Sequence, residues 1–274
     1  MGVLLGALSA VFYGIADFLG GEGAKRSPAP AIVLWSGVVS FPFVVAVALI
    51  VGGEATTTDL VIGALAGTSG AFGLVSLFAG LARGRAASVA PVSAVLAGIF
   101  PVLVAVALGE RPSALAWLGI ALAVPAVALS AAVGSSLRAE GVAFGVAAGF
   151  GFGGYAIVID LTAAASRLLP LITARAATMA VVGLVAWAGV WAVAGPREVP
   201  GRIVAGNGIL DVAGNIALLA GLRAGSLALV AMAGSFFPAV TVAMARVVNG
   251  ERLLRRQILG VALTLAALAA IALG

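Results

Sequence analysis

The stretch PAIVLWSGVVSFPFVVAVALIV, residues 30–51, contains 22 consecutive positions without a charged side chain. An α-helix rises about 1.5 Å per residue, and the hydrocarbon core of a bilayer is roughly 30 Å thick. About 20 apolar residues are therefore enough for one crossing. This stretch predicts a transmembrane helix.

The whole chain has the same apolar character. Hydrophobic residues make up 63% of the 274 positions and charged residues 9%, and the mean hydropathy is +1.24. A water-soluble protein of this size would lack the polar residues needed to cover its surface. The composition therefore predicts an integral membrane protein.

Nine further stretches resemble the first, which predicts ten transmembrane helices with little sequence left for loops. The alternation of apolar and polar residues that membrane β-strands need is absent, so the predicted fold class is all-α. The 38 glycines suit such a bundle, because small residues let helices approach closely in lipid. The predicted spans are Val3 to Gly21, Pro30 to Val51, Leu60 to Ala82, Ala86 to Leu108, Ala114 to Val133, Gly141 to Leu161, Leu169 to Ala194, Ile203 to Leu222, Ser226 to Val248 and Gln257 to Leu273.

A shift of the sequence by 141 positions reveals an internal repeat. It aligns Gly80-Leu81 with Gly221-Leu222, and Gly109-Glu110-Arg111 with Gly250-Glu251-Arg252, without a gap. We therefore predict two five-helix repeats, residues 1–136 and residues 137–274. Because five is odd, the second repeat enters the membrane with the opposite orientation. Such inverted repeats can form two near-equivalent packings around a site near the midplane, which is the basis of alternating access.

Basic residues lie mostly in the loops after the odd-numbered spans. The positive-inside rule then places these loops in the cytoplasm and both termini outside. We expect a multi-pass protein of the cell membrane, and the use of arginine in 14 of 15 basic positions suggests a bacterial inner membrane. No basic region precedes the first span, so no cleaved signal peptide is expected. The odd-numbered loops hold Lys25, Arg26, Arg83, Arg85, Arg138, Arg197, Arg202, Arg252, Arg255 and Arg256, and the others hold Arg111, Arg167 and Arg223.

Several function classes are excluded by composition. The chain has no cysteine and no histidine, which excludes thiol and imidazole catalysis and the usual zinc ligand sets. No metal or cofactor is expected, and the lone lysine, Lys25, does not belong to a phosphate-binding loop. The net charge of +5 comes from arginines at the ends of spans, so it does not indicate nucleic-acid binding.

Polar residues inside the spans are the candidate site residues, because they are costly in lipid. Asn207, Asp211 and Asn215 recur every four residues in the eighth span and therefore lie near one face of a helix. This stripe is expected to face a hydrated cavity or the substrate. Alternatively, Asn207 and Asn215 link helices through hydrogen bonds.

Four further residues complete the predicted site. Asp17 lies deep in the first span, or alternatively reaches the headgroups. Both Asp17 and Asp211 are candidates for binding a coupling proton, because transfer out of water favours the neutral carboxyl group. Arg175 is expected either to snorkel to the interface or to pair with an anionic substrate group or Asp160. Tyr13 and Tyr155 are candidates for stacking on the substrate, with aromatic packing as the alternative.

Two motifs have structural interpretations. Pro91, Pro101, Pro125 and Pro238 lie inside predicted spans, where a proline removes a backbone donor and can kink its helix. The Gly-Glu-Arg motif at residues 109–111 is interpreted as a helix end with a charge pair at the interface.

The motifs resemble the EamA branch of the drug/metabolite transporter superfamily across both halves. The first half carries Ala87-Ser88-Val89-Ala90-Pro91, Phe100-Pro101-Val102-Leu103, Gly109-Glu110-Arg111-Pro112 and Trp117-Leu118-Gly119, and the second carries Ser235-Phe236-Phe237-Pro238-Ala239-Val240-Thr241-Val242, Gly250-Glu251-Arg252 and Leu259-Gly260. The first span has Tyr13-Gly14 where the family commonly has a Trp-Gly pair. The resemblance implies a secondary carrier of ten helices in two inverted repeats, often exporting amino acids, nucleosides or other small metabolites.

The expected function is secondary active transport of a small molecule, with protons as a candidate coupling ion and a monomer or homodimer as the unit. Two rivals remain open at this point. A membrane-embedded enzyme acting on a lipid-linked substrate would have to rely on Asp17, Asp160 and Asp211 for acid-base catalysis. A scaffold subunit would pack the Asn207, Asp211 and Asn215 face dry against another helix.

Overall fold

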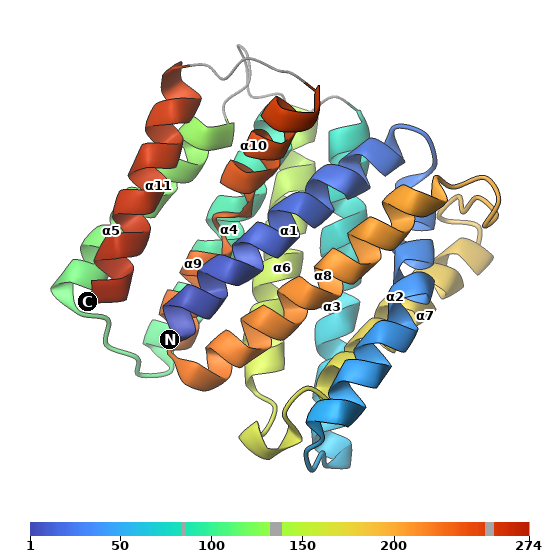
Figure 1. Ribbon diagram of the computed structural model, residues 1–274, viewed down its shortest axis with the longest axis horizontal. Helices are drawn as coiled ribbons and strands as arrows, with labels where there is room; N and C mark the ends of the chain where they lie inside the picture. Colours follow the sequence, from blue (N-terminus) through green and yellow to red (C-terminus); the bar gives the residue numbers. More distant parts are fainter. Residues whose placement is uncertain (84–85, 132–138, 250–254, 274) are drawn as a thin grey trace.

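The computed structural model describes residues 1–274 except 84–85, 132–138, 250–254 and 274, and the described part is helical, without strands (Figure 1). The described helices are α1 (Gly2–Ala24), α2 (Ala29–Val51), α3 (Thr57–Ala82), α4 (Ala86–Ala107), α5 (Ala114–Ala131), α6 (Ala139–Asp160), the 3-10 turn η1 (Ala164–Ser166), α7 (Pro170–Trp187), α8 (Gly201–Ala224), α9 (Leu227–Gly234), α10 (Phe237–Asn249) and α11 (Arg255–Leu273). Among them α1, α2, α3, α6, α7 and α8 are long and apolar enough to cross a membrane. The predicted all-α class is confirmed, whereas the count of ten spans stays a prediction.

The seventh predicted span is shorter than expected. α7 ends at Trp187 rather than at Ala194, and the chain continues as turns and loop to Pro200. Gly189 there has φ +75°, a left-handed conformation that favours glycine and stops the helix. The indole N–H of Trp35 donates to the carbonyl of Ala194 at 2.9 Å and ties this loop back to α2.

The ninth predicted span is divided into α9 and α10 at Ser235 and Phe236. Pro238 explains the break, because it donates no backbone hydrogen bond and its ring would clash with the carbonyl of Gly234, four residues earlier. The hydroxyl of Ser235 donates to the carbonyl of Met232 at 2.8 Å, which satisfies one of the freed acceptors. The break lies against the central cavity described below, where irregular backbone is tolerated within a membrane.

The start of α9 is held by the first Gly-Glu-Arg motif. The carboxylate of Glu110 accepts hydrogen bonds from the backbone N–H groups of Leu227 at 3.0 Å and Ala228 at 3.3 Å. A carboxylate at a helix N-terminus satisfies free donors and interacts favourably with the helix dipole. The motif is therefore structural, as interpreted from the sequence, but the role of Glu110 is to cap α9 and not to form the expected charge pair. The second Gly-Glu-Arg motif and the boundary between residues 136 and 137 lie outside the described residues.

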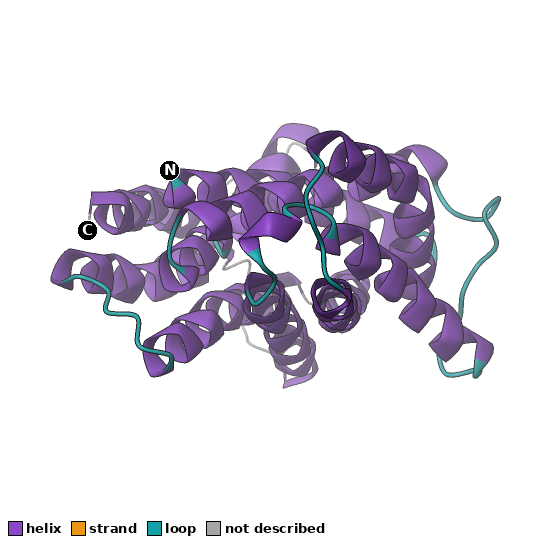
Figure 2. Ribbon diagram, turned by 90° about the horizontal axis from the view of Figure 1, so that it is seen from below, coloured by secondary structure: helices purple, strands orange, loops and turns teal. Residues whose placement is uncertain are grey.

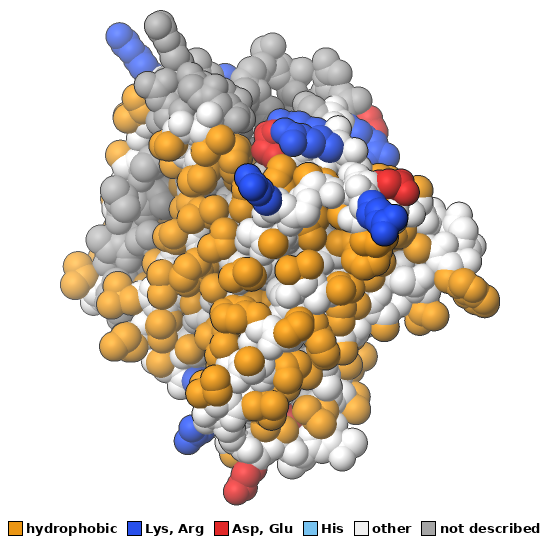
Figure 3. Space-filling model, turned by 45° about the vertical axis from the view of Figure 1, so that its right-hand side comes forward, with side chains coloured by type: hydrophobic (Ala, Val, Ile, Leu, Met, Phe, Trp, Pro, Cys, Tyr) orange, Lys and Arg blue, Asp and Glu red, His pale blue; other side chains and the backbone are white. Residues whose placement is uncertain are grey.

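The helices pack mainly against partners far away in the sequence. α1 lies along α8, α6 packs against both α3 and α4, and α5 pairs with α11 at one side of the molecule (Figures 1 and 2). Large apolar side chains are exposed over this outer surface, such as Leu4, Ile50 and Leu184. Figure 3 shows this apolar belt, with most Lys and Arg side chains at the end where the α1–α2 and α7–α8 connections lie. The surface is that of a protein surrounded by lipid.

Candidate functional site

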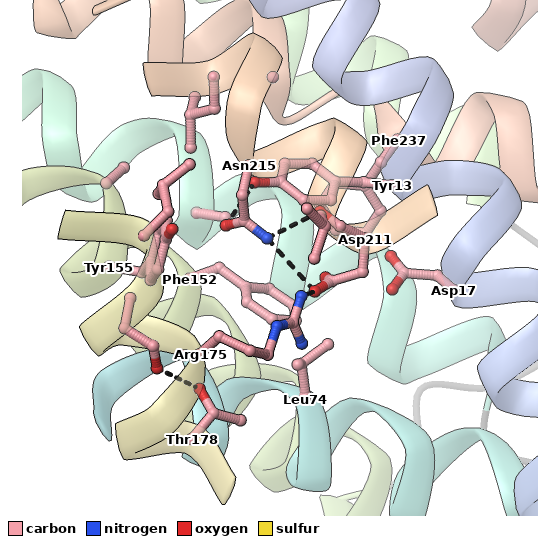
Figure 4. A pocket seen from close by; sticks show the side chains of 18 of the residues that line it. Tyr13, Asp17, Leu74, Phe152, Tyr155, Arg175, Thr178, Asp211, Asn215 and Phe237 are labelled. Carbon is pink, nitrogen blue, oxygen red and sulfur yellow. Dashed lines mark hydrogen bonds and ion pairs between the residues drawn. The ribbon is translucent and has the colours of Figure 1, made fainter. Parts of the chain in front are cut away.

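The central cavity lies where the two halves of the chain meet. Its lining comes from α1, α2, α3 and α4 of the first half of the sequence and from α6, α7, α8, α9 and α10 of the second half. The space open to the centres of water molecules is about 100 Å³, which is room for several waters or a small ligand. Most of the lining is apolar, and the polar groups gather around α7 and α8 (Figure 4).

A buried ion pair joins Arg175 of α7 to Asp211 of α8. A guanidinium Nη2 donates to the Asp211 Oδ2, and both residues are 7% exposed. Arg175 therefore does not snorkel to the interface, and it pairs with Asp211 instead of Asp160. The pair must form a stable unit, because removing one partner would leave an uncompensated charge away from water.

Asn215 extends this pair into a chain of hydrogen bonds. Its side-chain N–H₂ group donates to the backbone carbonyl of Asp211 at 2.7 Å and to the Asp211 Oδ2 at 3.2 Å. Its Oδ1 accepts from the Tyr13 hydroxyl at 3.1 Å. The chain Tyr13, Asn215, Asp211, Arg175 thus connects α1, α8 and α7 along one wall of the cavity (Figure 4).

Asp17 lies one turn beyond Tyr13 on α1 and also lines the cavity. It is 6% exposed, so it does not reach the headgroups as the alternative interpretation expected. The interfacial charges at this end of α1 are Glu22 and Lys25, which pair at 2.5 Å. Within the described part of the chain the Asp17 carboxyl group has no hydrogen bond or ion pair with another side chain or backbone group.

Asn207 does not reach the cavity, although it shares the four-residue spacing of Asp211 and Asn215. It is 3% exposed, and its N–H₂ group donates to the carbonyl of Ala16 at 2.7 Å, which links α8 to α1. The reason is the helix period: four residues turn by about 40° more than a full turn, so two steps rotate a side chain by about 80°. Asn207 therefore takes the linking role that was the alternative for this stripe.

Tyr155 lines the cavity from α6. Its hydroxyl makes no hydrogen bond with any described residue, in contrast to the hydroxyl of Tyr13. The ring lies close to α3, where a Cβ placed on Gly70 would be 3.2 Å from it. The absence of a side chain at Gly70 therefore makes room for this ring.

Three residues that the sequence analysis did not select also line the cavity: Thr178, Phe152 and Phe237. The Thr178 hydroxyl donates to the carbonyl of Gly67 at 2.9 Å and lies one turn beyond Arg175, a spacing that could have revealed it. The rings of Phe152 and Phe237 meet edge to face with centroids 6.1 Å apart. Phe152 likewise lies one turn before Tyr155. Phe237 reaches the cavity beside the break before α10, and its place next to Pro238 in the quoted motif is the sequence signal that could have revealed it.

No three acidic side chains come together among the described residues in a group that could hold a metal ion. The polar groups form a compact site with two acids, one base, two amide or hydroxyl partners and an aromatic surround. Such a site is suited to binding a small polar ligand.

Comparison with solved structures establishes the fold. Fourteen solved chains match, and one of them, described only as "Crystal structure of protein", has a TM-score of 0.72 and 18% sequence identity. That match covers 99% of this chain and 98% of the other. No curated protein matches the sequence. At this level of identity the likeness is one of fold alone.

Comparison with family models identifies the first half. Residues 1–132 match the model of the EamA-like transporter family. This agrees with the resemblance drawn from the motifs and with the membrane-spanning helices, and the matched family is one of membrane transporters. Residues 1–132 of this chain are therefore similar to the EamA-like transporter family, in agreement with an EamA-type transporter.

Proposed function

We propose that the protein is a secondary active transporter that exports a small metabolite by alternating access. The observation that carries this proposal is the position of the cavity, which is lined by helices from both halves and contains a buried ion pair within a polar chain. A scaffold with a dry interior would have no use for such a cavity. The family points in the same direction, because its members are transporters.

The packing of the helices supports two inverted five-helix repeats. α2 and α7 begin at Ala29 and Pro170, α4 and α9 at Ala86 and Leu227, and α5 and α11 at Ala114 and Arg255, each pair 141 positions apart. The contacts between helices follow the same relation. In the shift of 141 positions α1 corresponds to α6 and α3 to α8, and α1 packs on α8 while α6 packs on α3. A two-fold relation between the halves would convert each of these contacts into the other.

A pair of glycines supports the same relation at the level of atoms. A Cβ placed on Gly80 would lie 2.6 Å from a methyl group of Val89, and a Cβ placed on Gly221 would lie 3.0 Å from a methyl group of Val230. Gly80 and Gly221 are 141 positions apart, and so are Val89 and Val230. The same close helix contact therefore occurs in each half.

Alternating access follows from this arrangement if the two halves can exchange packings. Each half supplies one set of helix contacts around the cavity, and an inverted repeat offers two near-equivalent ways to close it. The break between α9 and α10 provides a place where one wall can adjust without moving a whole helix. Asp17 and Asp211, which both line the cavity, are the candidates for binding a coupling proton.

Transport by purified protein in liposomes tests the proposal. We expect protein-dependent efflux of at least one compound from a panel of preloaded amino acids, nucleosides and organic cations, with a faster rate under an imposed pH gradient. The double variant Arg175→Gln/Asp211→Asn removes both charges of the buried pair and should abolish this efflux. Absence of flux across the whole panel would support a scaffold role instead.

Two single variants assign the coupling step. If Asp17 or Asp211 binds the coupling proton, its change to Asn should remove the acceleration of any remaining flux by the pH gradient. An Asp211→Asn variant that keeps its full dependence on the gradient would exclude Asp211 from this role, and the same test applies to Asp17. Glu22→Gln, on the same helix as Asp17 but at the interface, is the control.

A further inference from the structure

We propose that the cavity binds a small organic cation, whose ammonium group lies against the Asp17 carboxylate within the aromatic lining. This inference rests on the proposed transport function and names the chemical class of its substrate.

The charges that line the cavity are unbalanced. Among the described residues, the charged members of the lining are Asp17, Asp211 and Arg175, which gives two carboxyl groups and one guanidinium. Arg175 and Asp211 already neutralise each other, and Asn215 adds a further hydrogen bond to the same carboxylate. Asp17 is left as a buried acid without a protein partner in the described part of the chain.

A buried carboxylate needs a partner, because leaving an isolated charge away from water is very unfavourable. The side chain is 6% exposed and borders the cavity, so whatever neutralises the carboxylate, a proton or a ligand cation, must reach it from within that space. Figure 4 shows the Asp17 carboxyl group directed toward Asp211 from the side opposite Arg175. A ligand cation there would be attracted by both carboxylates.

The rest of the lining fits the organic part of such a cation. Four aromatic residues line the cavity: Tyr13, Phe152, Tyr155 and Phe237. Aromatic rings attract cations within about 6 Å of their centres, and this attraction is strongest away from water. An inorganic cation would instead need several oxygen ligands, and the Asn215 Oδ1 is already occupied by the Tyr13 hydroxyl.

The same geometry disfavours anions and zwitterions. An anion would meet two carboxyl groups. A zwitterion would need a free cation for its carboxylate, and Arg175, the one basic residue in the described lining, is already bound to Asp211. Binding of the carboxylate would therefore require the buried ion pair to break.

A ligand series of nearly constant shape tests this selectivity. The compounds are phenethylamine (cation), 2-phenylethanol (neutral), phenylalanine (zwitterion) and 3-phenylpropanoate (anion). Bound ligand raises the unfolding temperature of the purified protein by mass action, so titrations of that temperature give relative affinities. We expect phenethylamine to bind at least tenfold more tightly than each of the other three. Equal binding of the amine and the alcohol, tighter binding of phenylalanine, or an equal effect from sodium chloride alone would overturn the proposal.

Variants assign the binding to Asp17. We expect Asp17→Asn to weaken binding of phenethylamine at least tenfold while 2-phenylethanol binding stays within twofold. Glu22→Gln removes the same charge near the C-terminal end of the same helix, and it should change the binding of neither compound. Retention of the amine preference by Asp17→Asn would overturn the assignment. Should that variant fail to fold, the four-ligand series on the unmodified protein decides the proposal by itself.

Flux measurements separate this proposal from the proposed function. Phenethylamine that binds but is not carried across liposomes would leave the cation site standing and contradict transport of this class of compound. Transport of neutral or anionic compounds without the amine would leave the transport function standing and overturn the cation class.

Discussion

Helices α3 and α8 are equivalent under the shift of 141 positions, yet only α8 carries the polar site. Asp211 and Asn215 of α8 correspond to Gly70 and Leu74 of α3, and all four border the cavity. Arg175 of α7 corresponds in the same way to Leu34 of α2. Glycines at helix contacts recur at the same positions of both halves, whereas the Arg175–Asp211 ion pair has no counterpart in the first half. Two halves that match in the positions of their glycines can therefore differ in the polar groups that they bring to the cavity.

The helix that follows shows the same contrast. Pro238 corresponds to Ala97 of α4, and α4 is continuous where α9 and α10 are separated. Ala97 keeps its backbone N–H and fits a helix, while Pro238 cannot continue one. The second half therefore supplies both the buried ion pair and the irregular wall of the cavity.

The largest effect is expected from Arg175→Gln. It leaves the Asp211 carboxylate buried without its partner, which should lower the free energy of unfolding by about 3 kcal/mol or more. Thermal unfolding in detergent measures this loss. The double variant Arg175→Gln/Asp211→Asn should be more stable than the single one, and Arg202→Gln, at an exposed position, should stay within about 0.5 kcal/mol of the unmodified protein. Unchanged stability of the single variant would contradict the buried pair.

A second prediction compares two repeated glycines, Gly67 and Gly208. A Cβ at Gly67 would overlap the carbonyl oxygen of Ala174, and one at Gly208 would overlap that of Ser36. Replacing either glycine with alanine should cost about 1–3 kcal/mol, because helix backbones would have to separate. Similar losses in the unfolding temperature are expected for both if the halves share one scaffold. Gly183→Ala is the control, since no atom lies within 4 Å of the added Cβ; a loss there of the same size would refute this explanation.

A smaller difference is expected between the two tyrosines of the cavity, one from each half. Tyr13→Phe removes a hydrogen bond to Asn215 and should cost about 1 kcal/mol. Tyr155→Phe removes a hydroxyl without a hydrogen bond to the described residues and should leave the unfolding temperature nearly unchanged. Equal losses of unfolding temperature in the two variants would mean that the hydrogen bond from the Tyr13 hydroxyl to Asn215 adds no stability.

The smallest effect is expected at Glu110, which joins the halves by capping α9. Glu110→Gln retains an acceptor but loses the charge near the helix N-terminus, a loss of about 0.3–1 kcal/mol. Because salt screens exposed charges, the difference in unfolding temperature should shrink at high salt. Glu54→Gln, a change at an exposed acid that caps no described helix, serves as the comparison and should show no loss. A loss at Glu110 that does not depend on salt would point to geometry instead of charge.

Much of the site was predictable from the sequence because polar residues are rare in the spans. Asp17, Asp211, Asn215, Tyr13, Tyr155 and Arg175 were selected in this way, and all of them line the cavity. Asn207 was selected by the same rule, but it links α8 to α1 instead of lining the cavity. A spacing of four residues exceeds one helical turn by about 40°, so the spacing alone does not show which of the three side chains face the cavity. The partner of Arg175 could not be predicted, because Asp160 and Asp211 both lie in neighbouring spans and only their orientation separates them.

Length and hydrophobicity by themselves determined that this chain forms membrane helices, because an apolar segment in lipid must satisfy its own backbone hydrogen bonds. The repeat of 141 positions was also visible without coordinates. Which groups meet was decided only by the tertiary structure. Arg175 and Asp211 are 36 positions apart and lie on different helices, so their pairing depends on the rotation and depth of each helix, which packing against distant helices sets.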